Sequence, residues 1–234
     1  MLNGKESLVV RIYAHRGASA DFPENTIPAF ARAVELGAFG IELDVHLSRD
    51  GVPVAIHDES VDRTTNGSGF VADLDLADLQ RLDAGDRATI PTLAEVLDLT
   101  EEHLHVDIEV KAAEAADAVL SETARRPNLR FAISSFNHDV LRHVRRSSSS
   151  IELWPLTHAV SDDVLETATE LGSPLIAPSD RFMNREIIEH ISDNGLGCWV
   201  WTVNHPTRAE ALIAFGVVGL CTDDPAALIH LQRP

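Results

Sequence analysis

The stretch from Ile41 to Asp58, IELDVHLSRDGVPVAIHD, combines acidic and imidazole side chains in a pattern that suits a binding or catalytic site. In an extended strand Glu42 and Asp44 point to one side, and the apolar residues between them point to the other. The Asp-Gly pair at 50–51 is a strong signal for a two-residue hairpin turn. With the turn centred there, residue i pairs with residue 101 − i, so Asp44 lies opposite His57. One hairpin is therefore expected to gather two carboxylates and an imidazole on one face.

A second group of polar residues belongs to a strand expected over 103–111, where Glu109 and Lys111 share a face. If the two strands are neighbours, the carboxylates of Glu42, Asp44 and Glu109 converge and repel one another without a cation. Oxygen ligands without a Cys/His cluster favour Mg²⁺ or Ca²⁺ over zinc. The sequence therefore predicts a site for one of these two ions.

Two histidines and two cations complete the chemistry that these residues suggest. His15 and His57 suit the roles of general acid and base, because an ordinary histidine pKa lies near neutral pH. Arg16 offers a planar fork that matches phosphate, and Lys111 offers a point charge. Together with a metal ion, these cations would neutralise a phosphodiester. The residues therefore predict phosphodiester cleavage.

Five further residues carry weaker signals. Trp201 suits a wall of the pocket, because aromatic side chains line ligand clefts. Asn25 fits a helix N-cap as well as it fits a site. Asp223 fits the start of a helix, since a proline follows two residues later. His105 and Asp107 share the inward parity of the carboxylate at 109, and the pattern assigns them no role.

Strands and helices alternate along the chain around these residues. The expected strands cover 8–14, 39–45, 103–111, 129–134, 151–156, 175–177, 198–203 and 217–221. The expected helices cover 25–36, 91–99, 112–126, 139–146, 161–171, 184–194, 206–215 and 225–231. This alternation is the pattern of an eight-stranded α/β barrel, a TIM barrel, in which chemistry lies at the carboxyl ends of the strands.

The alternative fold is a doubly wound open sheet. It is the weaker prediction, because Gly17 stands alone after the first strand and no glycine-rich phosphate loop is present. A length of 234 residues fits a single domain spanning 1–234. The polar segment 59–90, with a short helix expected near 75–82, is long for a connection and is expected to form a small inserted cap.

The composition restricts the partners of the chain. Lys and Arg number 19 against 37 Asp and Glu, which gives a formal net charge of −18 and excludes nucleic acid and stable contact with anionic membranes. Cys198 and Cys221 lie in separate apolar segments and are expected to be buried free thiols. No apolar run near the N-terminus is long enough for a signal peptide or membrane helix, so a cytoplasmic location is predicted. The oligomeric state stays open, with a homodimer among the options.

The motifs, taken in order from about residue 12 to residue 230, resemble those of the glycerophosphodiester phosphodiesterase family. The motifs that carry this resemblance are HRG at 15–17, PENT at 23–26, ExD at 42–44, HD at 57–58, IPTLxE at 90–95, IEVK at 108–111, SSF at 134–136, WTVN at 201–204 and TDxP at 222–225. So many motifs at sensible spacing make the resemblance highly specific.

The resemblance implies a TIM barrel that hydrolyses glycerophosphodiesters to sn-glycerol 3-phosphate and an alcohol. It also implies site residues, namely the acid/base pair His15 and His57, the metal ligands Glu42, Asp44 and Glu109, and the phosphate contacts Arg16 and Lys111. The segment 59–90 would correspond to the cap of the family, which is usually somewhat longer. Either the glycerol hydroxyl or a water molecule could attack phosphorus.

Three other functions are compatible with a barrel. A lysophospholipase D-like phosphodiesterase would favour an apolar interfacial patch, which this acidic sequence with few aromatic residues does not show. A non-catalytic barrel that binds glycerophosphate-like ligands would be expected to lack a histidine or a carboxylate of the site. A metal-dependent sugar isomerase fits less well, because Arg16 and Lys111 suit phosphate better than a neutral sugar.

Overall fold

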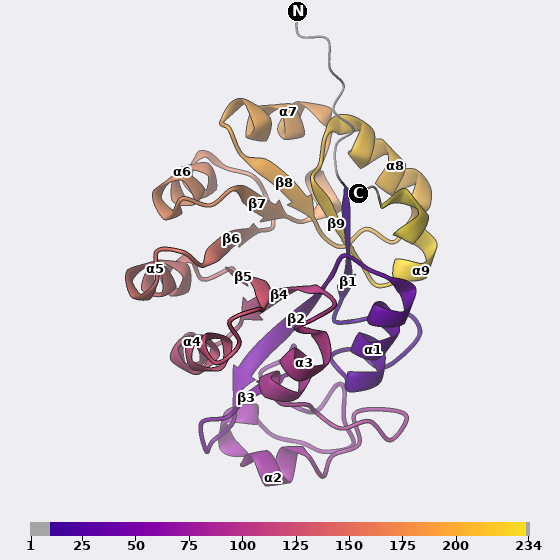
Figure 1. The fold of residues 1–234 in the computed structure, drawn as a ribbon, viewed down its shortest axis with the longest axis vertical. Coiled ribbons are helices and arrows are strands. Elements are labelled where there is room, and N and C mark those ends of the chain that lie inside the picture. The colour runs from indigo at the N-terminus through magenta and orange to yellow at the C-terminus, as the bar shows by residue number, and fades with distance from the viewer. Residues whose placement is uncertain (1–9, 233–234) are drawn as a thin grey trace, which may run out of the picture.

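A computed structural model of the chain describes residues 10–232, and within them eight parallel strands close into a barrel (Figure 1). The barrel strands are β1 (Arg11–His15), β2 (Gly40–Leu47), β4 (His105–Val110), β5 (Arg130–Ser135), β6 (Glu152–Thr157), β7 (Leu175–Pro178), β8 (Gly197–Val200) and β9 (Gly219–Thr222). Their order is β1-β9-β8-β7-β6-β5-β4-β2, and a parallel pairing between β1 and β2 closes the ring. The predicted TIM barrel is confirmed, since an open doubly wound sheet would leave two strand edges unpaired.

Helices surround the barrel, as Figure 1 shows. They are α1 (Ile27–Leu36), α3 (Leu93–Thr100), α4 (Ala116–Ala124), α5 (His138–Ser147), α6 (Asp162–Leu171), α7 (Arg185–Asp193), α8 (Pro206–Phe215) and α9 (Pro225–Leu228). Within residues 10–232, none of the helices is long and apolar enough to cross a membrane.

Several element boundaries differ from the sequence predictions by a few residues. The strand expected over 198–203 ends at Val200, and the helix expected from residue 112 begins with a 3₁₀ turn at Ala113–Ala115. The first strand begins at Arg11, and the predicted start at Leu8 lies outside the described residues. These differences are small, because ends of elements depend on local capping and pairing more than on periodicity.

The outward-facing residues of the strands form the main apolar core. Ile41 and Leu43 of β2 are fully buried against the apolar faces of α1 and α3. Thr92 begins α3 through a capping box, in which its side chain accepts a hydrogen bond from the Glu95 backbone and the Glu95 carboxylate accepts one from the Thr92 backbone. This packing fixes β2, which carries two of the predicted site carboxylates.

Aromatic rings fill the inner floor of the barrel. Tyr13, Trp154 and Trp199 pack with ring centroids 5.4–5.7 Å apart. His105 stacks on Trp154, and its Nδ1 lies 3.1 Å from the Tyr13 hydroxyl. Burial lowers the pKa of His105 to about 3, so the ring is neutral at physiological pH. His105 is therefore part of the aromatic floor. This packing explains why a polar residue points inward at this position, to which the sequence assigned no role.

The hairpin after β2 has a different register from the predicted one. Strand β3 (Pro53–Ala55) pairs antiparallel with β2, and partners such as Val45 and Ala55 have numbers that add to 100 rather than 101. Asp44 is therefore not opposite His57, which lies two residues beyond the end of β3. The predicted cross-strand pair is wrong.

The extra residue in the hairpin loop explains the shift. The backbone amide of Ser48 donates to the carbonyl of Val52 at 3.0 Å, so the loop contains three residues instead of two. Gly51 ends the loop with φ of +83°, the left-handed conformation that a three-residue hairpin requires at this position. The Asp-Gly pair does mark the turn, but the turn is of a longer type.

The segment 59–90 lies outside the ring of helices. Figure 1 shows its short helix α2 (Leu76–Leu79) next to β3 at one end of the molecule. The segment has a small apolar core of its own, in which Val61, Val71 and Leu79 are almost completely buried. It therefore packs as a compact unit against β3.

Candidate active site

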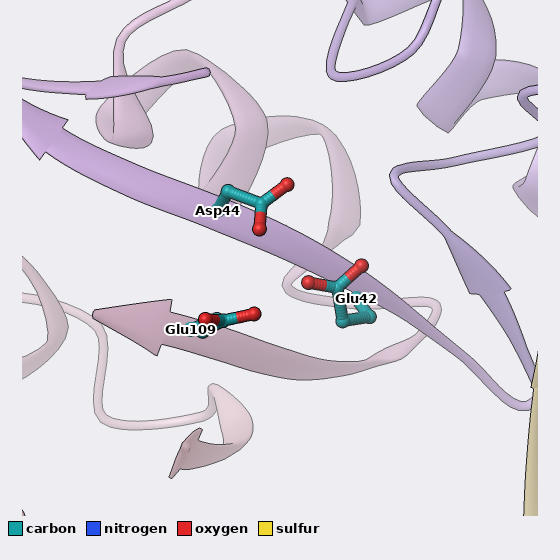
Figure 2. Close-up of side chains that lie close together, drawn as sticks. All are labelled: Glu42, Asp44 and Glu109. Carbon is teal, nitrogen blue, oxygen red and sulfur yellow. The ribbon is translucent and has the colours of Figure 1, made fainter. Parts of the chain in front are cut away.

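Three carboxylates converge on the inner face of β2 and β4. Parallel pairing places Asp44 next to Glu109, while Glu42 lies two residues earlier on the same face of β2. All three side chains are buried, and one carboxylate oxygen from each lies within 4.8 Å of the others. Figure 2 shows Glu42 and Asp44 on β2 facing Glu109 on the neighbouring strand. The structure thus brings together the three predicted metal ligands.

Two cations contact this cluster without neutralising it. Lys111 Nζ lies 3.1 Å from Asp44 Oδ1 and 2.6 Å from Glu109 Oε1, and Arg16 Nε lies 3.1 Å from Asp44 Oδ2. Burial works to raise the pKa of Asp44, but Lys111 and Arg16 outweigh it and hold that pKa well below its usual range. Burial and the neighbouring carboxylates raise the pKa of Glu42 well above its usual range, and burial and Asp44 raise that of Glu109 to about 7.

The donor set fits a hard divalent cation. It consists of carboxylate oxygens alone, which Mg²⁺ and Ca²⁺ prefer. Asp44 Oδ1 is buried, and its contact with Lys111 Nζ at 3.1 Å is an ion pair without hydrogen-bond geometry. A divalent charge at this position would favour the ionised forms of Glu42 and Glu109, whose pKa values are raised in its absence. The cluster could therefore hold a divalent ion.

Two residues with left-handed backbone hold the loops around the cluster. Arg16 has φ of +58° and Asn25 has φ of +56°, which are unusual conformations for residues other than glycine. The Arg16 amide donates to the Glu42 carbonyl at 2.9 Å, and the Asn25 side chain donates to Asp44 Oδ2 at 2.8 Å. Asn25 is therefore a partner of the cluster, and the N-cap of α1 is Thr26.

Both predicted histidines reach the cavity, and each has a carboxylate behind it. His15 Nδ1 lies 2.6 Å from Asp223 Oδ1, and His57 Nδ1 lies 2.6 Å from Asp58 Oδ1. When Nδ1–H donates to a carboxylate, the opposite nitrogen, Nε2, is left for the cavity. His15 Nε2 lies 3.9 Å from Glu42 Oε2, which places it at the edge of the carboxylate cluster. Burial lowers the pKa of His57.

The sequence did not identify Asp223 as a site residue. The helix that it was expected to start does follow, but Asp224 is its N-cap, and Asp223 points to His15 instead. Asn204 donates to the other carboxylate oxygen of Asp223 at 2.6 Å, which fixes its orientation. The available signal was its position, because Asp223 comes directly after β9 at the carboxyl end of the barrel.

A cavity of about 310 Å³ connects these groups. One wall is charged, and the other is aromatic, where Phe136 stacks on His158 at 4.6 Å and meets Trp201 nearly perpendicularly at 5.5 Å. Asp107 belongs to the floor, where burial raises its pKa well above the usual range. The predicted site residues that line the cavity are His15, Arg16, Glu42, His57, Glu109, Lys111 and Trp201. Asp44 lies behind this wall, against Lys111 and Arg16.

The cavity opens at the carboxyl ends of the barrel strands. A cluster of three carboxylates, two cations and two histidines in such a cavity is typical of barrel enzymes that cleave phosphoesters. Residues 15–227 match the model of the glycerophosphoryl diester phosphodiesterase family. This match covers most of the chain, so the chain belongs to that family of phosphoric diester hydrolases. The family resemblance drawn from the motifs is confirmed.

Several relatives are similar over nearly their whole length. The chain is 40% identical to the glycerophosphodiester phosphodiesterase of Caldanaerobacter subterraneus subsp. tengcongensis, with 95% of this chain and 97% of the relative covered. It is 32% identical to that of Bacillus altitudinis, with coverage of 96% and 99%. Among solved structures, a phosphodiesterase from Oleispira antarctica, in complex with the product sn-glycerol 3-phosphate, superposes with a TM-score of 0.91 at 27% identity, with coverage of 96% and 97%.

Proposed function

We propose that this enzyme hydrolyses glycerophosphodiesters to sn-glycerol 3-phosphate and an alcohol in a reaction that depends on Mg²⁺ or Ca²⁺. The observation that carries the proposal is the buried cluster of Glu42, Asp44 and Glu109, which faces a cavity lined by two histidines and two cations. The names of the relatives and the product bound to the Oleispira antarctica phosphodiesterase support this substrate class.

In the proposed mechanism Glu42, Asp44 and Glu109 would hold the metal ion, which would supply positive charge to neutralise the phosphoryl oxygens. Arg16 and Lys111 contact the phosphate and orient it in the cavity. One histidine accepts a proton at Nε2 from the nucleophile, and the other donates a proton from Nε2 to the departing alkoxide. Attack by water gives sn-glycerol 3-phosphate directly, whereas attack by the glycerol hydroxyl gives a cyclic phosphate that a water molecule then opens to the same product. Asp223 and Asp58 keep both rings in the tautomer that these steps need.

Three further predictions belong to this proposal. Trp201 forms a wall against the organic part of the substrate, the segment 59–90 serves as a cap on a single barrel domain, and the protein works in the cytoplasm. The aromatic contacts of Trp201 and the separate small core of 59–90 support the first two. The two free, buried cysteines support a reducing compartment.

A substrate panel tests the proposed reaction. Purified enzyme is incubated with glycerophosphocholine, glycerophosphoglycerol, bis(p-nitrophenyl) phosphate and lysophosphatidylcholine, each with Mg²⁺, Ca²⁺ or EDTA, and the products are quantified. We expect sn-glycerol 3-phosphate from the first two substrates and no turnover in EDTA. Faster cleavage of lysophosphatidylcholine would favour a lysophospholipase D-like enzyme, and binding without turnover would favour a non-catalytic barrel. Full activity in EDTA would refute the metal dependence.

A further inference from the structure

Arg63, in the segment 59–90, contacts two carboxylates that each hold a residue of the cavity. Its guanidinium donates to both oxygens of Glu24 at 2.8 and 2.9 Å and to both oxygens of Asp58 at 2.7 and 3.0 Å. Glu24 Oε1 also accepts a hydrogen bond from Arg16 at 2.9 Å, and Asp58 Oδ1 lies 2.6 Å from His57 Nδ1. A continuous chain of contacts therefore runs from Arg16 to His57 through Arg63.

Other residues of the segment 59–90 brace the backbone that carries Arg63. Val61, two residues earlier, is fully buried in the small apolar core, and its amide donates to the carbonyl of Gly69. Asn66, three residues later, exchanges two hydrogen bonds with Asp83, at 2.9 and 3.0 Å. Arg63 thus stands on a turn that is braced on both sides.

Arg63 stabilises the ionised forms of both carboxylates. Hydrogen bonds from Arg63 hold the pKa of Asp58 well below its usual range. Burial works to raise the pKa of Glu24, but Arg63 and Arg16 keep it below its usual value. The planar guanidinium serves both carboxylates at once, which a lysine ammonium cannot do with the same geometry.

We propose that Arg63 is a positioning residue, which orients Arg16 through Glu24 and His57 through Asp58 and so couples the segment 59–90 to the cavity. The proposal rests on the proposed phosphodiesterase function. Without Arg63, Glu24 and Asp58 are two neighbouring anions without a shared cation. Each is then free to turn away, and both the phosphate contact and the imidazole lose a fixed partner.

Replacing Arg63 tests the proposal, and Arg49 provides a matched control. Arg49 is a similarly exposed arginine that chelates the carboxylate of Asp75, with Nε 2.8 Å from Oδ1, and within residues 10–232 its hydrogen bonds reach no residue of the cavity. We expect Arg63→Ala to lower kcat/KM by about 10- to 100-fold, the usual effect of losing a partner that orients site ligands. Arg63→Lys should lie between Arg63→Ala and wild type, guanidinium ion should partly restore Arg63→Ala, and Arg49→Ala should match wild type.

Double-mutant cycles show whether Arg63 acts through its two partners. In a protein that carries Glu24→Gln and Asp58→Asn, the further change Arg63→Ala should cost less than threefold, because the groups it orients are already released. Additive losses, or an Arg63→Ala enzyme as active as Arg49→Ala, would overturn the proposal. Thermal unfolding of each variant shows whether its loss of activity is caused by instability. If Arg63→Ala is unstable, the activity of Arg63→Lys provides the test, because the proposal expects it to lie below that of wild type.

An NMR titration of His57 provides a readout that needs no turnover. The groups that face this ring are Asp44 and Asp58, which raise its pKa, and Lys111 and Arg16, which lower it, in addition to burial. Loss of Arg63 releases Asp58, whose hydrogen bond raises the pKa of His57, so the pKa of His57 should fall in Arg63→Ala and remain unchanged in Arg49→Ala. An unchanged or raised His57 pKa in Arg63→Ala would refute the coupling, because Asp58 would then keep its position without Arg63, whereas an inactive wild-type enzyme would refute only the proposed reaction.

Discussion

At the residue scale, the proposed acid and base roles of the two histidines depend on which ring nitrogen each of them leaves free for proton transfer. His15 and His57 both commit Nδ1 to a carboxylate, so Nε2 is free for proton transfer. General acid–base catalysis contributes about 10²- to 10⁴-fold, so His15→Ala and His57→Ala should each lower kcat by that order. Isothermal titration should find Mg²⁺ binding largely unchanged, because neither ring is a proposed ligand. Near-wild-type rates in both variants would contradict the assignment.

The carboxylate cluster predicts that metal binding depends on pH. Without a metal ion, burial and Asp44 raise the pKa of Glu109 to about 7, and burial and the neighbouring carboxylates also raise that of Glu42, so both groups bind protons more readily than an ordinary carboxylate as the pH falls. A metal ion must displace those protons, and its apparent affinity should rise by about tenfold per pH unit for each proton displaced, levelling off above the pKa.

Thermal unfolding with Mg²⁺ and with EDTA at pH 5 to 8 measures this effect. The difference in Tm between the two conditions should grow as the pH rises, while Glu109→Gln should show a much smaller difference at every pH. Because the Tm values with Mg²⁺ and with EDTA are compared at the same pH, the contribution of His105 to the pH dependence of stability is the same in both and cancels. A difference that stays constant from pH 5 to 8 would contradict the prediction.

At the scale of elements, the loop after β1 is more tightly constrained than the β2–β3 hairpin. Gly17 and Gly51 have φ of +81° and +83°, but a Cβ on Gly17 would lie 2.6 Å from the Ala29 backbone, while one on Gly51 would meet nothing within 4 Å. Gly51→Ala should cost about 1–2 kcal/mol from the left-handed backbone alone. Gly17→Ala adds an overlap with α1 and should cost about 2–4 kcal/mol. Urea unfolding of both variants measures these costs, and equal costs would contradict the packing argument.

The elements also explain which parts of the site the sequence could predict. The inward direction of Glu42, Asp44 and Glu109 follows from alternation along a strand, which is a local property. The pairing of Asp44 with His57 failed because it depended on the number of residues in the hairpin loop, and an Asp-Gly pair fits loops of two or three residues.

Contacts between loops were beyond the reach of the sequence patterns. Asn25 reaches Asp44, and Asp223 reaches His15 across 208 positions of the chain, because the conformations of loops at the barrel mouth bring them there. Arg63 joins Glu24 and Asp58 in the same way. Such conformations depend on left-handed residues and on packing against neighbouring loops, which periodicity does not encode. The family motifs partly compensated, since they include Asp58 and Asp223 without explaining them.

At the scale of the whole molecule, closure of the barrel turns these separate loops into one site. The pairing of β1 with both β2 and β9 brings the His15 loop between the acidic cluster and Asp223. Aromatic rings fill the space below, so the charged groups lie in the upper layers, where water and substrate have access. The closed sheet therefore encloses aromatic rings below the site and carries the charged groups at its open end.

The net charge of the molecule predicts a dependence on ionic strength. The formal charge of −18 repels an anionic substrate before it reaches the local cations of the cavity. Salt shortens the screening length from about 30 Å at 0.01 M to about 8 Å at 0.15 M and so weakens this repulsion. Between these conditions, kcat/KM for glycerophosphoglycerol, an anion, should rise by about two- to tenfold. Glycerophosphocholine is a zwitterion and provides the control, whose kcat/KM should change little. A fall in kcat/KM for the anion would mean that Arg16, Lys111 and the bound metal dominate the approach of substrate over the charge of the whole surface.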